Sequence, residues 1–263
     1  MLLNDFNATE HKDRIVQWIR DWFEENGKDC KAVIGISGGK DSSVAAALCV
    51  EALGRERVFG VLMPNGIQPD ISDSYKVVAH LGIKFIVENI HSIYEGFLQN
   101  FDNEYPFGIK SLGVKIEPSE QTKINLPPRI RMTTLYAISQ SINGRVVCTD
   151  NLSESYIGYS TRWGDNIGDF APLANYTASE VVAIGDALGL PFDLTHKTPS
   201  DGLCGQTDED RFGFTYEQLD TYIRTGKCDN PEVELSIITK RENNRFKRIY
   251  IPYPYSHQRV YGW

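Results

Sequence analysis

The chain has 263 residues, of which 41% are hydrophobic and 24% are charged, an ordinary composition for one large globular domain over residues 1–263. No apolar run approaches the roughly 18 residues that a membrane span needs, so we expect a soluble protein with no membrane partner. A formal net charge of −8 argues against nucleic-acid binding, which depends on a basic surface.

The predicted elements alternate between helix and strand. Apolar residues recur at helical spacing from Ile15 to Phe23 and Gly27 follows, which predicts an amphipathic helix. Further elements are expected at 32–37 (strand), 42–53 (helix), 58–63 (strand), 73–81 (helix), 84–90 (strand), 131–142 (helix) and 145–149 (strand). This alternation predicts an α/β fold, a Rossmann-like parallel sheet flanked by helices on both faces.

Two later helices are indicated by N-terminal capping boxes, in which a threonine is followed three residues later by Glu or Gln. The boxes are Thr177 with Glu180, and Thr215 with Gln218. Segments 99–128 and 198–214 have weak periodicity and many Gly, Pro and Asp residues. We expect both to be mobile loops, and 198–214 to act as a lid.

The glycine-rich loop ISGGKDSS (36–43) joins the first predicted strand to the helix after it. A strand that runs through such a loop into a helix points backbone N–H groups and the positive end of the helix dipole at one spot, which favours an anion. The serines add hydroxyl donors and Lys40 adds positive charge. We expect a phosphate there, although two glycines can also simply form a tight turn.

Asp41 distinguishes this loop from other phosphate-binding loops. A Walker A loop has four residues between its glycines, whereas three separate Gly35 from Gly39 and an aspartate follows the lysine. The dinucleotide fingerprint G-x-G-x-x-G is also absent from it. A carboxylate beside a phosphate is repelled unless a divalent cation lies between them, so Asp41 is interpreted as a magnesium ligand.

The hexapeptide SGGKDS (37–42) resembles the SGGxDS loop of the N-type ATP pyrophosphatases, which have an adenine nucleotide alpha hydrolase-like fold and cleave ATP between its α and β phosphates. Later segments are similar to motifs of the ammonia-dependent NAD synthetases within that superfamily. These segments are NLPPRIRM (125–132), TDNLSE (149–154), YSTRWGDNIGDFAPL (159–173), KTPSDGL (197–203) and GFTYEQLDTY (213–222).

The resemblance implies a magnesium-dependent, homodimeric ligase. In this chemistry ATP adenylates the nicotinate carboxylate of deamido-NAD, pyrophosphate departs into the loop at 37–43, and ammonia displaces AMP to give NAD. An enzyme that uses glutamine would need an added amidase domain with a nucleophilic cysteine, and 263 residues leave no room for one. Free ammonia, or ammonia delivered by another protein, is therefore the expected nitrogen donor.

The resemblance also implies roles for individual residues. The implied catalytic residues are Asp41, Lys40 and Lys197. The implied magnesium ligands are Asp41 and Glu154. The implied deamido-NAD contacts are Arg129, Asp165 and Lys197. The implied ATP contacts are Ser37, Gly38, Gly39, Lys40, Asp41, Ser42, Ser43, Arg131, Thr149 and Ser200.

Each of these roles has a purely structural alternative. Asp165 and Asp169 could form a solvated acidic face, and Glu154 could cap a helix or pair with an arginine. Arg129 and Arg131 could be surface charges. Glu154 nevertheless follows a predicted buried strand, and the carboxyl ends of strands are where open α/β sheets bind ligands.

The chain departs from the family pattern at several positions. Pro127 and Pro128 stand where small or flexible residues are usual. Ala178 stands where many relatives carry a lysine, which removes one positive charge. Ser200 replaces a more usual threonine, and Phe246 replaces a histidine.

Two other functions remain open at this level: another N-type ATP pyrophosphatase, amide-forming or tRNA-modifying, and a non-catalytic nucleotide-binding sensor. A tRNA-modifying enzyme would carry a basic surface or metal-binding cysteines. The five cysteines are odd in number and include no C-x-x-C pair, which argues against a zinc site and a disulfide framework. With no export signal in residues 1–9, we expect a cytoplasmic protein.

Overall fold

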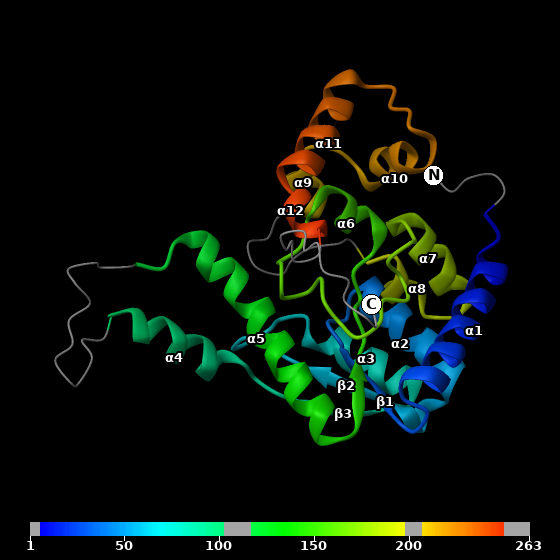
Figure 1. The fold of residues 1–263 in the computed structure, drawn as a ribbon, viewed down its shortest axis with the longest axis vertical. Helices are drawn as coiled ribbons and strands as arrows, with labels where there is room; N and C mark the ends of the chain where they lie inside the picture. Colours follow the sequence, from blue (N-terminus) through cyan, green and yellow to red (C-terminus); the bar gives the residue numbers. More distant parts are fainter. Residues whose placement is uncertain (1–5, 103–116, 198–206, 250–263) are drawn as a thin grey trace, which may run out of the picture.

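The computed structural model describes residues 6–102, 117–197 and 207–249, and its centre is a parallel sheet (Figure 1). The strands are β1 (Lys31–Gly35), β2 (Val58–Leu62), β3 (Lys84–Val87) and β4 (Gly144–Val146), in the spatial order β3-β2-β1-β4. Each neighbouring pair is parallel, which confirms the predicted α/β fold. After β1 the chain adds β2 and β3 on one side of β1, and β4 then pairs with β1 on its other side. The strand order therefore reverses between β1 and β4.

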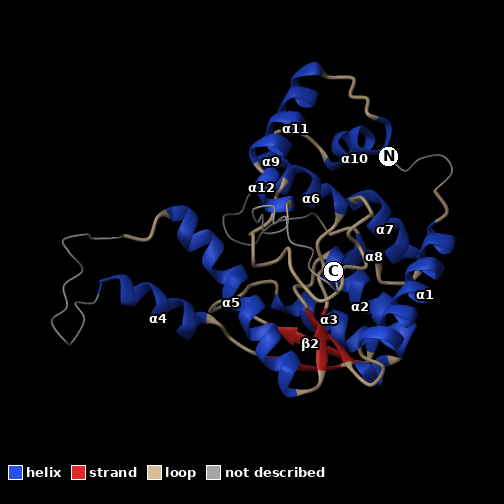
Figure 2. Cartoon of the chain, in the orientation of Figure 1, coloured by secondary structure: helices blue, strands red, loops and turns tan. Residues whose placement is uncertain are grey.

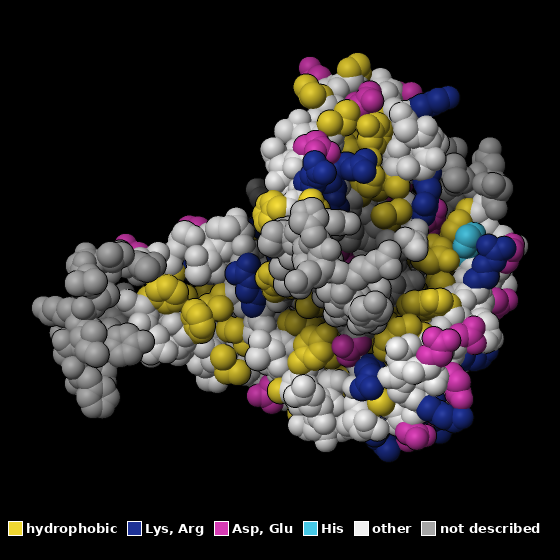
Figure 3. Space-filling view, in the orientation of Figure 1, with side chains coloured by type: hydrophobic (Ala, Val, Ile, Leu, Met, Phe, Trp, Pro, Cys, Tyr) yellow, Lys and Arg dark blue, Asp and Glu magenta, His cyan; other side chains and the backbone are white. Residues whose placement is uncertain are grey.

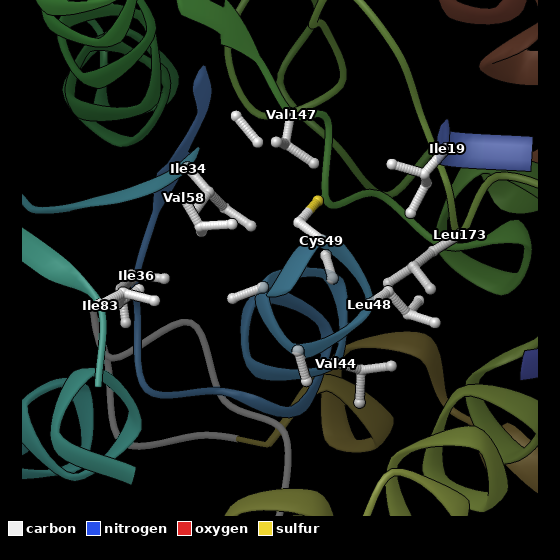
Figure 4. Close-up of a cluster of buried hydrophobic side chains, with 14 of the residues drawn as sticks. Ile19, Ile34, Ile36, Val44, Leu48, Cys49, Val58, Ile83, Val147 and Leu173 are labelled. Carbon is white, nitrogen blue, oxygen red and sulfur yellow. The ribbon is translucent and has the colours of Figure 1, made fainter. Parts of the chain in front are cut away.

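One face of the sheet is covered by α2 (Lys40–Leu53), with α1 (Ala8–Asn26) and α7 (Ala178–Ala187) packed against it. Figure 4 shows Ile34 and Val58 of the sheet on the side of α2 that carries Cys49, and Leu48 of α2 near Leu173. Burying side chains of this size stabilises the fold by about 1.5–3 kcal/mol each. This packing holds the start of α2 just beyond the end of β1.

The other face is covered by α5 (Glu120–Ser141), with α4 (His91–Asp102) beside it. Val33 of β1, Val61 of β2 and Leu135 of α5 belong to the cluster of buried side chains on this face, which we call the second cluster. In Figure 1, α4 and the N-terminal half of α5 extend away from the sheet as a pair of helices, which we call the α4–α5 arm.

The remaining helices complete the fold (Figure 2). α3 (Ile71–Leu81) contacts α2, and the short η1 (Arg55–Arg57) precedes β2. A third cluster of buried side chains joins helices that follow β4, and it includes Ile157, Leu219 and Ile237. The later helices are α6 (Leu152–Ile157), α8 (Phe192–Thr195), α9 (Asp208–Phe212), α10 (Tyr216–Thr225), α11 (Pro231–Asn243) and α12 (Arg245–Arg248).

Both predicted capping boxes are present. Thr177 and Glu180 cap α7, and Thr215 and Gln218 cap α10, each through reciprocal side-chain and backbone hydrogen bonds. A third box, which the sequence analysis did not identify, caps α9 with Thr207. Among the described residues, no helix has the length and apolar character that crossing a membrane requires.

The prediction of long loops was wrong for several stretches. Residues 99–102 belong to α4, 120–128 to α5, and 208–212 to α9. α5 begins at Glu120, eleven residues before the helix start predicted at Arg131, and Pro127 and Pro128 lie inside it. Two prolines remove two N–H donors, but Leu126 and Ile130 on either side are buried in the second cluster and offset this loss. Residues 103–116 and 198–206 lie outside the described residues.

The predicted strands at 84–90 and 145–149 end early, at Val87 and Val146. After β4, the backbone N–H of Cys148 bonds to the carbonyl of Phe170, and Val147 bridges to the same residue. A carboxylate oxygen of Asp169 accepts the N–H of Val146 at 2.7 Å. The segment 169–170 therefore takes over the pairing at this end of the sheet, and Thr149 lies in a loop.

Candidate active site

A cavity of about 450 Å³ opens at the carboxyl ends of β1 and β4, where the strand order reverses. Open α/β sheets bind their ligands at this position, and the volume lies within the range of about 300–1,000 Å³ that is typical of small-molecule sites. Many sequence-predicted site residues line it together. They are Ser37, Gly39, Lys40, Asp41, Ser42, Arg131, Thr149, Glu154, Asp165 and Lys197.

The loop between β1 and α2 forms one wall of this cavity. Gly39 is the N-cap of α2, and no side chain of the described residues caps this helix, so its N-terminus offers backbone donors and a positive dipole to an anion. The hydroxyl oxygens of Ser37 and Ser42 lie 3.0 Å apart beside it. The loop therefore presents donors of the kind that phosphate groups accept.

Gly38 and Ser43 support the conformation of the loop and do not line the cavity. Gly38 has φ of +82°, and a Cβ there would lie 2.7 Å from the backbone nitrogen of Ser74 in α3. Only glycine fits this turn without displacing α3. The buried Ser43 donates its hydroxyl to the carbonyl oxygen of Gly39 at 2.8 Å.

Lys40 is buried, with 6% of its side chain exposed, and its ammonium group lies among carboxylates. Nζ donates to Oδ2 of Asp41 at 2.9 Å and lies 3.9 Å from Oε1 of Glu154. Burial lowers the pKa of Lys40, but the nearby negative charges of Asp41 and Glu154 outweigh burial and raise the net pKa above its usual value. Lys40 is therefore a buried cation that remains charged.

Asn151 bonds the side chain of Asp41 and the backbone of Glu154, the two residues that were predicted to bind magnesium. Its Nδ2 donates to Oδ1 of Asp41 at 3.0 Å, and its Oδ1 accepts the backbone N–H of Glu154 at 3.1 Å as the N-cap of α6. Asn151 is completely buried. Burial, followed by the charge of Asp41, raises the pKa of Glu154 well above its usual value.

Tyr216 and Asp208 also belong to this cluster, although neither was predicted to be a site residue. The hydroxyl of Tyr216 lies 3.2 Å from Oε1 of Glu154 and 3.1 Å from Oδ2 of Asp208, and its ring centre lies 5.2 Å from Nζ of Lys40. A phenol carries one proton, so it donates to one of the two carboxylates at a time. Asp208 also lines the cavity and accepts a hydrogen bond from Tyr159 at 3.1 Å.

A smaller cavity of about 150 Å³ adjoins the same loop and is lined partly by Asp150 and Asp165. Burial raises the pKa of Asp150 to about 7, although the hydroxyl of Ser155 donates to its carboxylate. Burial also raises the pKa of Asp165, whose Oδ1 accepts the N–H of Thr161 at 2.6 Å. Asp150 directly follows the predicted contact Thr149, and this position at a strand end was the signal that could have identified it.

Asp165 and Asp169 have different surroundings. Asp165 is directed to the cavities, whereas Asp169 binds the N–H of Val146 and accepts from the hydroxyl of Tyr136. Both side chains are exposed, and they contact different partners.

Lys197 reaches the cavity from the segment that follows α8. Its Nζ donates to Oδ2 of Asp70 at 2.9 Å and to Oδ2 of Asp73 at 2.7 Å, both near the N-terminus of α3. Burial lowers the pKa of Lys197, but these two hydrogen bonds raise the net pKa above its usual value. Lys197 is therefore a charged group held at the rim of the cavity beside the turn at Gly38.

The two predicted arginines occupy different positions on α5. Arg131 lines the cavity and donates from Nε to the carbonyl of Met63 at 3.0 Å, and burial lowers its pKa. Arg129 is exposed and donates to the carbonyl of Arg162 at 3.3 Å, so it does not line this cavity. Ser200 lies outside the described residues.

Asp41 and Glu154 provide the oxygen ligands that Mg²⁺ prefers. Among the described residues, no group of three or more His, Cys, Asp and Glu side chains is arranged to hold a metal by itself. Nucleotide-bound Mg²⁺ commonly takes only one or two protein carboxylates, together with phosphate oxygens and waters. The donor set therefore fits a magnesium ion that arrives with a nucleotide.

The glycine-rich loop, the uncapped helix N-terminus and the paired carboxylates at a topological switch point define an α/β protein built to bind a phosphate-bearing ligand. The chain belongs to the NAD synthase family, whose model matches residues 11–253. This finding confirms the resemblance seen in the sequence.

Named relatives agree with the family. The chain is 36% identical to the NH3-dependent NAD+ synthetase of Carboxydothermus hydrogenoformans over 245 residues, which cover 92% of this chain and 96% of the relative. It is 41% identical to the enzyme of the same name from Thermococcus sibiricus over 212 residues, or 80% of this chain and 78% of the relative.

Two solved structures are similar over almost the whole chain. The NMN synthetase from Francisella tularensis has a TM-score of 0.82 and 33% identity, and the match covers 95% of this chain and 99% of that one. The NH3-dependent NAD synthetase from Campylobacter jejuni has a TM-score of 0.74 and 26% identity, with 95% and 100% covered.

Proposed function

We propose that this protein is an ammonia-dependent NAD synthetase, a ligase that converts deamido-NAD, ATP and ammonia into NAD, AMP and pyrophosphate. The observation that carries the proposal is the convergence of an uncapped helix N-terminus, Asp41 and Glu154 on one cavity. The relatives that share most of this chain's length carry the same activity in their names.

The chemistry needs no protein nucleophile. A nicotinate carboxylate oxygen attacks the α-phosphorus of ATP, and the bond from that phosphorus to the bridging oxygen of the β-phosphate breaks. Ammonia then attacks the acyl carbon, AMP leaves with the former carboxylate oxygen, and nitrogen loses a proton as the amide forms. Catalysis therefore depends on positioning the reactants and on stabilising negative charge.

The cavity residues divide this work. The loop at 37–43 and the N-terminus of α2 receive the departing pyrophosphate, while Lys40 and Lys197 supply positive charge at its edges. Arg131 and Thr149 contact ATP, and Asp165 contacts the nicotinate-bearing substrate beside the smaller cavity. Ser200 is assigned to ATP by the family pattern alone.

Asp41 and Glu154 are proposed to hold Mg²⁺ together with the phosphates of ATP. When bound, the ion neutralises negative charge on the leaving pyrophosphate. Asn151 keeps Asp41 in place and starts the helix that carries Glu154, so the two ligands are oriented before nucleotide arrives.

The protein is proposed to act as a homodimer in the cytoplasm. The α4–α5 arm exposes large apolar side chains, among them Ile93, Phe97 and Ile124, and Figure 3 shows hydrophobic side chains gathered along it. An extended apolar surface of this kind is typical of a protein interface. Exposed Arg129 lies on the same arm, which fits a substrate contact made across that interface.

The four cysteines of the described residues are free thiols, in agreement with a reducing compartment.

One comparison provides a second candidate substrate. The structure with a TM-score of 0.82 is named an NMN synthetase, and the mononucleotide that such an enzyme amidates carries the same nicotinate carboxylate as deamido-NAD. Measuring kcat/KM for nicotinate mononucleotide and for deamido-NAD in parallel distinguishes the two. We expect the higher value for deamido-NAD, and a higher value for the mononucleotide would reassign the substrate.

The test of the reaction is an omission assay with ATP, magnesium, ammonium and deamido-NAD, in which AMP and NAD are followed. Both products should require every component, and Asp41→Asn should lower kcat by a factor on the order of 10²–10³. Asp193→Asn, a change at an exposed carboxylate, is the matched control. AMP formed equally well without deamido-NAD would contradict the assigned substrate, and release of ADP would contradict the cleavage site.

A further inference from the structure

Lys40 occupies an unusual position for a lysine. It is the first residue of α2, and a helix N-terminus disfavours positive charge. Its side chain is buried, which also disfavours an ammonium group unless a partner compensates. The compensation comes from Asp41 at 2.9 Å and Glu154 at 3.9 Å.

These two partners are the carboxylates assigned to magnesium. Within the described parts of the chain, the ion pairs of Asp41 and Glu154 are both with Lys40. The ammonium group thus takes up the charge of the two groups that a metal ion would have to contact. The ring of Tyr216, whose hydroxyl contacts Glu154, lies 5.2 Å from the same ammonium group and limits where it can move.

We propose that Lys40 is a resident counter-cation of the metal site, which neutralises Asp41 and Glu154 in the absence of metal and competes with a divalent cation for them. The proposal rests on the magnesium assignment made above. A free divalent cation must displace Nζ from Asp41 and therefore binds weakly. A cation that arrives with a nucleotide brings phosphate groups, and these give the displaced ammonium new acceptors beside the loop at 37–39.

This arrangement couples metal and nucleotide binding. Because phosphates compensate Lys40 for its lost carboxylate partners, nucleotide should strengthen metal binding, and metal should strengthen nucleotide binding by the same factor. The site would then fill with metal and nucleotide together. Removing the charge at Lys40 should tighten the binding of metal alone and weaken the coupling.

The first measurement is the binding of Mn²⁺ without nucleotide, followed by the electron paramagnetic resonance signal of the free ion. In Lys40→Met, which retains the length of the side chain without its charge, the dissociation constant should fall about tenfold, because one nearby positive charge has been removed from a partly desolvated site. Lys40→Arg should stay close to the unmodified protein. Lys76→Met, a change at an exposed lysine of α3, is the surface control.

The second measurement repeats this titration with a non-hydrolysable ATP analogue. The analogue should tighten Mn²⁺ binding strongly in the unmodified protein and less in Lys40→Met. If Lys40 only binds phosphate, Lys40→Met will weaken binding of the analogue and leave the affinity for Mn²⁺ without nucleotide unchanged. An unchanged affinity for Mn²⁺ alone overturns the proposal.

Two double variants separate this proposal from the metal assignment. Adding Asp41→Asn or Glu154→Gln to Lys40→Met should abolish the tight Mn²⁺ site. If Mn²⁺ still binds tightly, the metal site lies elsewhere and the assignment itself fails. If the double variants lose Mn²⁺ but Lys40→Met binds it no better than the unmodified protein, competition by Lys40 alone is refuted. Should Lys40→Met not fold by circular dichroism, Lys40→Gln is interpreted in the same way.

Discussion

Asn151 donates a hydrogen bond to Asp41 at 3.0 Å, across 110 positions of sequence. This bond ties the loop after β4 to the first turn of α2. Since the same side chain caps α6, one residue fixes the relative position of the two carboxylates proposed to bind magnesium. Such supporting groups determine how well a metal site is preorganised.

Asn151→Ala should therefore affect both stability and activity. Loss of the cap and of the bond to Asp41 should lower the free energy of unfolding by about 1–3 kcal/mol, measured by urea denaturation. The loosened carboxylates should lower kcat about 10–100-fold. Asn230→Ala is the matched control, because exposed Asn230 caps α11 and lines neither cavity. An equal loss of kcat in both variants would contradict a specific role for Asn151.

Gly38→Ala should disrupt the phosphate-binding loop. The added Cβ would lie 2.7 Å from the backbone of Ser74, so the loop or α3 must shift. Gly54→Ala is a close control, because Gly54 has almost the same φ, +81°, with nothing within 4 Å of the added Cβ. The control should lose about 1–2 kcal/mol of stability from backbone strain and keep its kcat. Gly38→Ala should lose more stability and should also raise KM for ATP; equal behaviour of the two variants would contradict this.

The loop at 37–43 could be predicted because its determinants are local. A buried strand, two glycines and an uncapped helix follow one another within a few residues, and their geometry does not depend on distant contacts. The same holds for the capping boxes at Thr177 and Thr215. Local patterns thus placed the sheet, the phosphate-binding loop and several helix starts.

The partners of Glu154 could not be predicted, because they arise from tertiary packing. Tyr216 meets Glu154 only after α10 packs beside α6 in the third cluster of buried side chains. α5 shows the same limit, since two prolines argue against a helix while burial of Leu126 and Ile130 stabilises it. Competition between local propensity and packing is decided by contacts that the sequence pattern does not display.

Asp220→Ala should destabilise the fold more than the loss of a single carboxylate at the surface. Asp220 is buried and accepts hydrogen bonds from the hydroxyl of Ser153 and the N–H of Ser179, joining α6, α7 and α10. Its loss leaves one buried and one partly buried donor without an acceptor, which should cost about 2–4 kcal/mol in urea denaturation. Exposed Asp229 is the control, and Asp229→Ala should change stability by less than about 0.5 kcal/mol. A similarly small change for Asp220→Ala would refute this role.

Asp73→Asn should impair catalysis through Lys197. Among the described residues, the substitution leaves the ammonium of Lys197 with Asp70 as its remaining carboxylate partner, so the charge is held less firmly at the rim of the cavity. Because positioned charge stabilises the reacting phosphates, kcat/KM for ATP should fall about tenfold in a steady-state assay. Asp73→Glu, which restores a carboxylate, should recover part of the loss.

The outer part of the same network provides the control for Asp73. Lys76 bridges Asp73 at 3.0 Å and Asp193 at 3.3 Å, so Asp193→Asn weakens the network without removing a partner of Lys197. This variant should keep its kcat/KM, because an exposed ion pair contributes little. Equal losses in Asp73→Asn and Asp193→Asn would mean that the network acts through α3 as a whole. A higher kcat/KM in Asp73→Asn would mean that the two carboxylates restrain Lys197 from the nucleotide and that their removal releases it.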